Sequence, residues 1–463
     1  MKQRWMILGL IYLLTACPTT PSSPGTTAQL YASATTGSDS NPGTSAAPLK
    51  TLRKALALVQ KGQTVRLEHG TYDVTNGEAF PETVPDGVSL LADNPRDILL
   101  LGKASQDGLI FAGSGSVVGL DLQGFGTAIT ATTGTQAFSN LALSGNTAGL
   151  NLSATAQATL DGNSSLKDGE IAVRLTGNAK LAMTGGVVSG MKGSGKPFDA
   201  GGLVGGFSTG ELSALTLTNV TVKNNLARWT VRLTETSSVT IKSSRFTGNG
   251  VTRGSGAVIE TAGSSRLDLE DTSLFLNNDD GVYVTENSSV TIKGGEISAG
   301  MTYGMYIGGA SATVVVDGTK INGNQEIGVR FDTGQLELAN AEIRGNKLYG
   351  IAFHNQAGPG SLKMRNTLVN DNGSVGVSVF FSTTTGQADL GTAVDLGKNT
   401  FKGNGIGLDV TGKVIVNASG NTWEPNQQGA DASGRYATGL PIVGPTPSGS
   451  KNISVATGST VQL

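Results

Sequence analysis

The sequence from 281 to 410 repeats one short unit. It reads GVYV at 281–284, GMYI at 304–307, GVRF at 328–331, GIAF at 350–353, GVSV at 376–379 and GLDV at 407–410. Each unit is a glycine followed by an apolar, a variable and an apolar residue. Four residues before five of these glycines stands an asparagine or a glycine, at Asn277, Gly300, Asn324, Asn346 and Asn372. The spacing of roughly 22 to 26 residues is typical of a solenoid.

A second alternating segment precedes each of the last five units. These segments read VTI at 290–292, VVV at 314–316, LEL at 336–338, LKM at 362–364 and VDL at 394–396. Alternation with a period of two sends one set of side chains inward and the other outward. One such coil cannot bury its apolar set alone, whereas stacked coils bury it in register. We expect glycine and asparagine at the corners, because they tolerate a left-handed backbone. The pattern therefore predicts an all-β fold, a single-stranded parallel β-helix.

The composition narrows the classes of protein to consider. The 463 residues include 67 glycines, only 15% are charged, and the formal net charge is −2. Glycine is enriched without a collagen-like period, which suits a solenoid dense in turns. No basic stripe is visible, so we expect no nucleic-acid partner. With two histidines, His69 and His354, the chain has no histidine-rich metal site, and we place His69 on the surface as a structural residue.

The N-terminus has the pattern of an exported precursor. Lys2 and Arg4 precede an apolar run from 5 to 14, which is too short to span a bilayer and reads as a signal peptide. The following LTAC at 14–17 resembles the lipobox of bacterial lipoprotein precursors. That resemblance implies cleavage before Cys17 and lipidation of its thiol, which would anchor the protein to the membrane of the cell envelope. The alternative is an ordinary secretory signal in which Cys17 is incidental.

The first part of the folded chain carries a recognisable block. It contains YAS at 31–33, GSDSNPGT at 37–44, PLKTL at 48–52, GQTV at 62–65 and GTY at 70–72. This block resembles the N-terminal block of a domain of unknown function in the pectin-lyase-like superfamily, and a similar block opens some polysaccharide lyases. The resemblance implies a right-handed parallel β-helix, which is also the usual hand of parallel crossovers.

Apolar residues at Leu52, Ala55, Leu56 and Val59 predict a short helix over 51–60, stopped by Gly62. The resemblance implies that this helix caps the first coil. A cap is also expected physically, because the open end of a β-helix exposes unpaired strand edges.

The chain divides into five consecutive segments. We expect a lipoprotein signal peptide at 1–16, the lipidated cysteine and a flexible tether at 17–27, an N-terminal cap with the first strands at 28–80, the β-helix at 81–440, and a linker with a last strand at 441–463. Within the helix, 190–210 is rich in glycine and serine and predicts an inserted loop. About 24 residues per coil gives on the order of 15 coils. At about 4.8 Å per coil the rod would be roughly 70 Å long.

Two sets of residues suggest catalysis. Asp279 and Asp280 stand at the entry to a strand, where paired carboxylates could act as acid and base in glycoside hydrolysis. Polygalacturonases resemble this fold and use such a pair, but their other signatures are not matched here. We favour a polar turn that caps backbone groups. Lys242 and Lys293, two coils apart, could lie on one line and supply a lyase base, although solvated surface lysines are the simpler interpretation.

One outward face is the best candidate for binding. The variable position of the glycine-led units holds Tyr283, Tyr306 and Arg330, followed by Ala352, Ser378 and Asp409. Two residues further on stand Asp332 and His354. Aromatic faces and planar polar groups suit sugar rings, so we predict that Tyr283, Tyr306, Arg330, Asp332 and His354 bind glycan. The alternative is an exposed sheet with incidental aromatics.

Three functions remain open at this stage. The first is an envelope-anchored, monomeric lipoprotein that binds extracellular polysaccharide or another surface polymer without catalysis. The second is a polysaccharide lyase or glycoside hydrolase acting on an acidic polysaccharide along the same face. The third is a structural surface rod. We expect no cofactor and no metal, with Ca²⁺ required only if the protein is a lyase.

Overall fold

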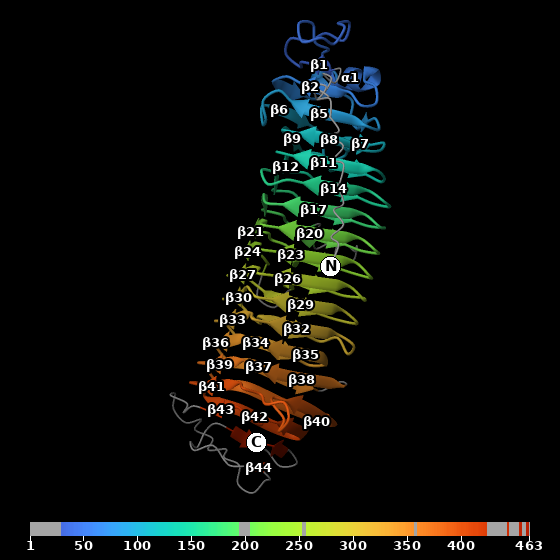
Figure 1. The fold of residues 1–463 in the computed structure, drawn as a ribbon. Coiled ribbons are helices and arrows are strands. Elements are labelled where there is room, and N and C mark those ends of the chain that lie inside the picture. The colour runs from blue at the N-terminus through green and yellow to red at the C-terminus, as the bar shows by residue number, and fades with distance from the viewer. Residues whose placement is uncertain are drawn as a thin grey trace, which may run out of the picture.

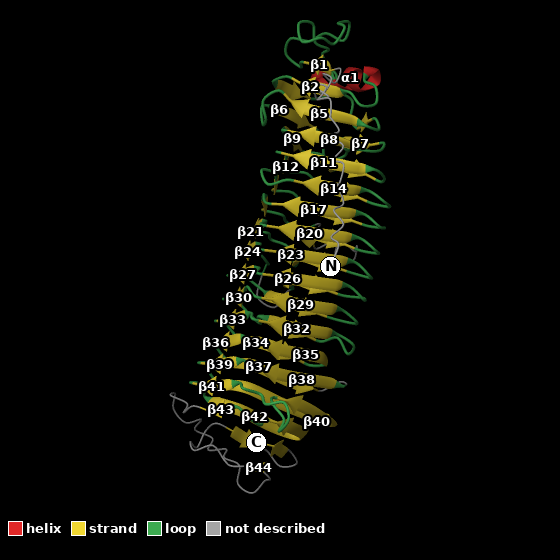
Figure 2. Cartoon of the chain, in the orientation of Figure 1, coloured by secondary structure: helices red, strands yellow, loops and turns green. Residues whose placement is uncertain are grey.

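The computed structural model describes residues 29–193, 204–251, 256–355, 359–423, 442–443, 453–455 and 460–462. Over these ranges the chain winds into a long rod of stacked coils, with β1 at one end and β42 near the other (Figure 1). Strands make up nearly the whole rod, and the helix α1 lies at the end that holds β1 (Figure 2). The predicted all-β parallel solenoid is confirmed.

One turn of the solenoid contains three strands that belong to three different sheets. In the middle of the rod, β28 (Asp280–Val284), β29 (Ser289–Lys293) and β30 (Glu296–Ser298) follow one another. The next strand, β31 (Met305–Ile307), returns beside β28 and pairs with it in parallel. Hydrogen bonds thus run from coil to coil, so each coil depends on its neighbours for stability.

The first sheet contains β29 and runs along the rod. Its strands are β1 (Gln29–Ala32), β2 (Thr64–Leu67), β5 (Val88–Ala92), β8 (Gly115–Val118), β11 (Thr135–Ser139), β14 (Gln157–Leu160), β17 (Lys180–Thr184), β20 (Ala214–Thr218), β23 (Ser238–Lys242), β26 (Arg266–Glu270), β29, β32 (Thr313–Asp317), β35 (Gly334–Ala339) and β38 (Gly360–Arg365). Its neighbouring strands pair in parallel.

The second sheet contains β28 and presents the outward row of tyrosines. Its strands are β4 (Glu82–Val84), β7 (Leu109–Phe111), β10 (Thr127–Ala131), β13 (Ala148–Leu152), β16 (Ile171–Leu175), β19 (Val204–Thr209), β22 (Trp229–Leu233), β25 (Ala257–Thr261), β28, β31, β34 (Ile327–Phe331) and β37 (Tyr349–Asn355). Two long strands, β40 (Val375–Asp389) and β42 (Ile406–Asn417), continue it and bend into the first sheet.

The third sheet is made of short strands, one from each coil. Its strands are β3 (Gly70–Tyr72), β6 (Ile98–Leu101), β9 (Leu120–Gln123), β12 (Ala142–Ser144), β15 (Ser165–Lys167), β18 (Val187–Ser189), β21 (Thr221–Lys223), β24 (Arg245–Thr247), β27 (Ser273–Phe275), β30, β33 (Lys320–Asn322), β36 (Glu342–Arg344), β39 (Leu368–Asn370), β41 (Thr400–Lys402) and β43 (Thr422–Trp423). This 15-stranded sheet agrees with the coil number expected from the repeat length.

The far end of the described rod contains three further strands. They are β44 (Ile442–Val443), β45 (Ile453–Val455) and β46 (Thr460–Gln462). β45 and β46 both pair with β42.

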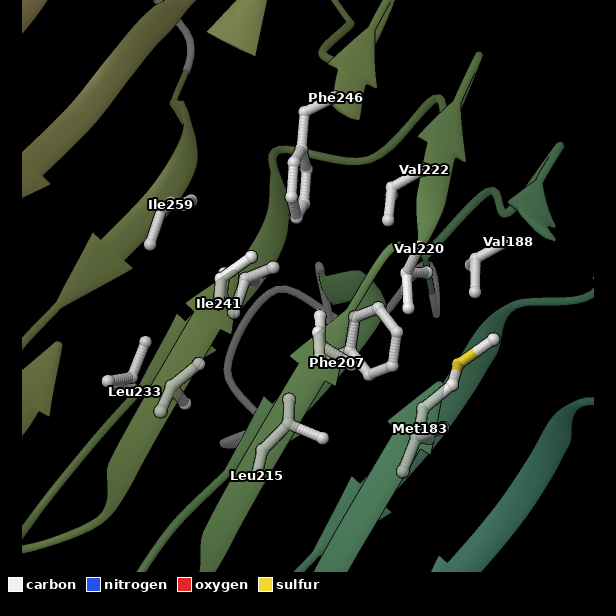
Figure 3. Packing of buried hydrophobic residues seen from close by; sticks show 14 of the residues in the cluster. Met183, Val188, Phe207, Leu215, Val220, Val222, Leu233, Ile241, Phe246 and Ile259 are labelled. Carbon is white, nitrogen blue, oxygen red and sulfur yellow. The ribbon is translucent and has the colours of Figure 1, made fainter. Parts of the chain in front are cut away.

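The core is a set of apolar columns along the bore. In the second sheet, Val282, Met305 and Val329 stand in register and are all fully buried. Phe331 stacks on Phe353 with ring centroids 4.2 Å apart. Figure 3 shows the same arrangement further up the rod, where Phe207 points inward among the side chains of the neighbouring strands. Burial of each such side chain stabilises the fold by about 1.5–3 kcal/mol.

The corner between the third and second sheets contains a ladder of buried asparagines. The members are Asn225, Asn249, Asn277, Asn324, Asn346, Asn372 and Asn404. In two runs, from Asn225 to Asn277 and from Asn324 to Asn404, the amide nitrogen of one rung donates to the side-chain oxygen of the next, for example from Asn346 to Asn372 at 3.0 Å. The ladder is interrupted at Gly300, whose backbone N–H donates to Asn324 Oδ1 at 3.1 Å. The asparagines before the glycine-led units therefore join successive coils.

The sequence suggested that the repeated glycines are needed for a left-handed backbone, but the structure gives a different reason for them. Gly328 does not have a positive φ. A Cβ added there would lie 2.6 Å from the carbonyl oxygen of Gly350 in the next coil, and Gly304 meets Gly328 in the same way. Close approach of coils excludes a side chain at these positions. Left-handed residues stand at all three corners of the coil, for example Asn340 (φ 53°) between the first and third sheets, Gly345 (φ 61°) between the third and second, and Glu286 (φ 55°) between the second and first.

Helix α1 (Leu52–Leu58) caps the rod as expected. Leu52, Ala55 and Leu56 are buried against the first strands. Thr51 is the N-cap, and its hydroxyl accepts from Lys54 N at 3.0 Å. The Glu78 carboxylate, from just after the short 3₁₀ helix η1 (Val74–Asn76), accepts from Leu52 N at 2.6 Å. These contacts satisfy backbone donors that a helix start leaves unpaired.

Two expected features are wrong. Residues 394–396 are not a strand, because the place beside Lys363 is taken by Asp389 at the end of β40, and Val394 is 97% exposed. The predicted insertion at 190–210 includes β19, which forms a rung between β16 and β22 and buries Phe207, while 194–203 lie outside the described residues. Both errors arise where the repeat changes length.

Candidate functional site

The outer face of the second sheet carries the residues singled out from the sequence. Tyr283, Tyr306, Arg330, Ala352, Ser378 and Asp409 stand in register on consecutive coils. We call this set the outer row. The strict repeat makes the row predictable, because identical units in identical register place their variable residues side by side.

Two tyrosines of the outer row stack on each other. The rings of Tyr283 and Tyr306 lie 4.7 Å apart with planes inclined by 14°. Tyr303, from the preceding turn, adds a third ring 6.3 Å from that of Tyr306. The stack uses ring faces internally, and the Tyr303 and Tyr306 hydroxyls bond to Arg330 and Asp332, so mainly the ring edges remain for a ligand. The sequence argument had assigned that role to ring faces.

Arg330 and Asp332 extend this stack. The guanidinium lies 5.6 Å from the ring centre of Tyr303 and 5.7 Å from that of Tyr306. Its Nη1 donates to the Tyr303 hydroxyl at 3.2 Å, and its Nε lies 3.3 Å from Asp332 Oδ1. The Tyr306 hydroxyl donates to Asp332 Oδ2 at 2.9 Å. These contacts hold a planar cation, a carboxylate and phenol groups in fixed positions.

His354 lies at the far side of the same group. It follows Phe353, which pairs with Phe331, so it lies beside Asp332 on the adjacent coil. Its Nε2 lies 3.0 Å from Ser378 Oγ. Burial and the nearby charge of Arg330 lower the pKa of His354, so the ring is neutral at pH 7. The structure thus brings together all five residues predicted to bind.

A second polar group precedes the tyrosines on the same face. Arg232 and Glu260 continue the register of the outer row, and their side chains form an ion pair at 2.7 Å. Arg228 and Arg232 each lie 4.4 Å from the ring centre of Trp229. Such contacts between arginine and indole are favourable and fix both groups. Sequence reasoning missed this group, because Thr230 and Val258 stand where the later units have their marker glycine.

Asp279 and Asp280 are both buried, with 0% and 6% of their surface exposed. Asp279 Oδ1 accepts from Asp280 N at 3.1 Å. Asp280 Oδ1 accepts from Thr302 Oγ1 and from Tyr303 N, the latter at 3.1 Å. The pair therefore binds backbone and side-chain donors of a turn, as the polar-turn interpretation expects. It lies at the coil where Gly300 interrupts the asparagine ladder.

Burial shifts the titration of two carboxyls on this face. It raises the pKa of Asp280 to about 6, although the hydrogen bonds from Thr302 and Tyr303 act in the opposite direction. Burial also raises the pKa of Glu260, against the attraction of Arg232. Both groups raise the pKa of Tyr283, whose own burial has the larger effect. The charge of the face therefore changes in the weakly acidic range.

The other sequence candidates lie elsewhere. Lys242 and Lys293 stand on one line of the first sheet, with Glu270 between them and 2.7 Å from Lys242 Nζ. His69 is exposed in the cap region. Cys17 lies outside the described residues. Neither the two lysines nor His69 joins the group around Tyr306.

Within the described ranges, no cluster of three or more His, Cys, Asp or Glu side chains could hold a metal ion. The same part of the chain contains no helix long and apolar enough to cross a membrane. A cavity of about 590 Å³ lies between Arg365 and the loop at 394–398, at the corner of the first and third sheets. It is separate from the outer row.

Two family models match parts of this chain. One describes a right-handed β-helix region and matches residues 229–390. The chain folds as a right-handed parallel β-helix. The other model, a protein of unknown function (DUF1565), matches residues 35–195 and so covers the block at 31–72 almost completely. Both support the pectin-lyase-like superfamily suggested by that block. Among curated proteins, none matches this chain in sequence.

Several solved structures are similar in shape. The periplasmic alginate epimerase AlgG is 11% identical, with 86% of this chain and 85% of that chain covered and a TM-score of 0.42. The A-module of the Azotobacter vinelandii mannuronan C-5 epimerase AlgE6 is 14% identical, with 89% and 93% covered and a TM-score of 0.37. The catalytic domain of a GH87 α-1,3-glucanase, in complex with tetrasaccharides, is 13% identical, with 96% and 70% covered and a TM-score of 0.45. At these values the likenesses carry no argument about substrate or activity.

Proposed function

We propose that the outer face of the second sheet, from Trp229 to His354, binds an extracellular polysaccharide without cleaving the polysaccharide chain. The observation that carries the proposal is the unbroken line of arginine, carboxylate and tyrosine groups on consecutive coils. Coils repeat about every 4.8 Å, so the line from Arg232 to Ser378 extends roughly 30 Å along the rod. An extended polymer that lies parallel to the rod axis could contact every coil.

The chemistry of the face fits sugar hydroxyls. Phenol groups donate and accept, carboxylates accept, and guanidinium groups donate in fixed directions. The Tyr306–Asp332–Arg330 contacts fix these groups before a ligand binds, which lowers the entropy cost of binding. Repetition over several coils would add many weak contacts, as in other multivalent binding.

A second candidate function is cleavage of an acidic polysaccharide on the same face. The observation that favours it is a neutral, half-buried His354 close to Arg330. A neutral imidazole can accept the proton that a lyase removes, while a guanidinium can pair with a uronate carboxylate. This reading would also allow a requirement for Ca²⁺. Asp279 and Asp280 support it poorly, since both bind the 302–303 turn.

Anchoring to the cell envelope completes the proposal. Cys17 would carry the lipid, and residues 18–27 would hold the rod away from the membrane as an extended, proline-containing tether. Growth of the expressing cells with radiolabelled palmitate would test it. Label in the full-length protein and none in Cys17→Ala is expected, whereas equal label in both would contradict lipidation at this residue.

The function is tested with the soluble chain starting at Ala28 and a panel of neutral and uronate-containing polysaccharides, with and without Ca²⁺. Retardation in polysaccharide affinity gels reports binding, while absorbance of unsaturated products and new reducing ends report cleavage. Binding without products supports the proposal. Products would establish the second candidate, and a folded protein that neither binds nor cleaves any member would leave only the structural rod.

A further inference from the structure

Ser378 and His354 form a contact that polysaccharide binding does not require. Ser378 lies on β40 and His354 on β37, so they come from neighbouring coils of the second sheet. Ser378 Oγ and His354 Nε2 are 3.0 Å apart. A serine hydroxyl at this distance from an unprotonated imidazole nitrogen has the arrangement of a nucleophile and its general base.

The imidazole ring is held in place from two sides. The ring of Tyr349 meets it edge-on with centroids 5.9 Å apart, and that of Phe380 does so at 6.0 Å. Phe380 also pairs in register with His354, so the aromatic contact follows from the strand pairing. A fixed ring keeps Nε2 directed at Ser378, which is what a proton acceptor in catalysis needs.

The charges around His354 suit a base at neutral pH. Burial and the charge of Arg330 favour the neutral ring, while Asp332 and Asp409 act in the opposite direction and are weaker. The charges of those carboxylates would stabilise the imidazolium once it forms. Arg330 is a cation on the same face that could attract a developing oxyanion.

We propose that Ser378 and His354 hydrolyse small acyl esters, such as O-acetyl groups carried by a glycan. The proposal rests on the proposed function only for the identity of the alcohol, because the acyl chemistry needs just the two side chains and water. Ser378 has 6% of its surface exposed. Because so little of Ser378 is open to solvent, a short acetyl group fits beside its hydroxyl better than a longer acyl chain does.

The reaction follows two steps. In the first, Ser378 Oγ bonds to the carbonyl carbon while its proton moves to His354 Nε2. The ester C–O bond then breaks, and the leaving alcohol takes that proton. In the second, water attacks the acetyl-serine and gives a proton to Nε2. Acetic acid leaves and ionises in solution, and Ser378 recovers its hydroxyl proton from the ring.

The soluble chain starting at Ala28 tests this with p-nitrophenyl acetate, p-nitrophenyl hexanoate and a small fluorophosphonate. We expect hydrolysis of the acetate at least about tenfold faster than that of the hexanoate, and one fluorophosphonate adduct that peptide mass spectrometry maps to Ser378. Ser378→Ala should lower hydrolysis at least ~100-fold, and His354→Asn should lower it similarly. The wild-type rate should rise with pH through a midpoint below ~6.5, the ordinary imidazole value.

The matched control is Ser208→Ala. Ser208 lies on β19 of the same face with 8% of its surface exposed, and neither histidine of the chain is near it in sequence or register. This variant should hydrolyse acetate esters and take the label like the wild type. Adduct mapping on the wild type does not depend on how any variant folds.

Absence of both hydrolysis and adduct in the folded wild type would overturn the proposal, as would an adduct at any other residue. Retardation by unacetylated glycans is measured separately on the same wild-type protein. Glycan binding without ester hydrolysis refutes this inference alone, whereas ester hydrolysis without glycan binding refutes the proposed function alone.

Discussion

Tyr283 and Tyr306 lie face to face on neighbouring coils, with ring centroids 4.7 Å apart and planes inclined by 14°. The two residues are register partners, so the stacking follows directly from the parallel pairing of β28 and β31. Arg330 extends the stack by lying over the ring of Tyr306. The face is therefore rigid before any ligand binds. The predictions below for Tyr306 and Arg330 depend on this fixed arrangement of side chains.

Removing one hydroxyl from the stack should have a small, specific effect. Tyr306→Phe loses the hydrogen bond to Asp332 but keeps the ring contact with Tyr283. We expect a decrease in the free energy of unfolding of roughly 0.5–1.5 kcal/mol, measured by urea denaturation. Tyr306→Ala should lose more, because it also removes ring packing. Equal stability of the two variants would contradict a stacked arrangement.

Arg330→Lys tests whether the planar group matters. Lysine keeps the charge but cannot stack on the tyrosines or match two oxygens of Asp332. We expect at least several-fold weaker glycan retention in affinity gels with an unchanged circular dichroism spectrum. Retention equal to that of the wild type would show that charge alone is sufficient at this position.

The asparagine ladder should be costly to break. Asn346→Ala removes the acceptor of Asn324 N and Nδ2 and the amide donor to Ile321 O and Asn372 Oδ1, inside the rod where Asn346 is 1% exposed. Unpaired buried polar groups cost about 1–3 kcal/mol each, so a loss of roughly 2–4 kcal/mol is expected in urea denaturation. Asn178→Ala, at an exposed position, is the control and should stay within about 0.5 kcal/mol of the wild type.

The close approach of coils predicts intolerance of any side chain at 328. A Cβ in Gly328→Ala would lie 2.6 Å from the backbone oxygen of Gly350, which cannot move without disturbing the next coil. We expect a loss of roughly 1–3 kcal/mol. Gly323→Ala is an informative comparison, since a Cβ there meets nothing within 4 Å but the residue has φ 63°. Its cost would reflect backbone strain alone, of about 1 kcal/mol.

Stability should depend on pH through Asp280. Its folded pKa of about 6 is raised above the ordinary aspartate value, mainly by burial. Protonated Asp280 stabilises the fold. This stabilisation is complete below the unfolded pKa of about 3.8 and is lost as pH rises from there through about 6. We expect the difference in unfolding free energy between wild type and Asp280→Asn to change by roughly 2–3 kcal/mol between pH 7 and pH 4. A difference that is constant with pH would contradict the burial of this carboxyl.

The sequence predicts most of the fold because the repeat is strict. Register between units at 281–410 places Tyr283, Tyr306 and Arg330 side by side without further information, and the structure has that register. Tyr303 could not be placed in the same way, because it lies in a turn outside the aligned units. Trp229 and Glu260 belong to coils without the marker glycine, so the repeat did not single them out.

Local pattern also misled where two segments compete for one place. Residues 394–396 alternate like a strand, yet the end of β40 occupies the rung beside Lys363. The reason for the repeated glycines could not be read from the sequence either. A corner that needs positive φ and a coil that leaves no room for Cβ both select glycine, and only the distance from Gly328 to Gly350 separates them.

The most direct test of the binding face compares two double variants with the wild type in polysaccharide affinity gels. Tyr283→Ala with Tyr306→Ala removes the centre of the outer row, while Lys242→Ala with Lys293→Ala removes exposed charges from the first sheet. We predict that the first pair abolishes retention, that the second leaves it intact, and that both keep the wild-type circular dichroism spectrum. Full retention in the tyrosine variant, or loss in the lysine variant alone, would contradict the account.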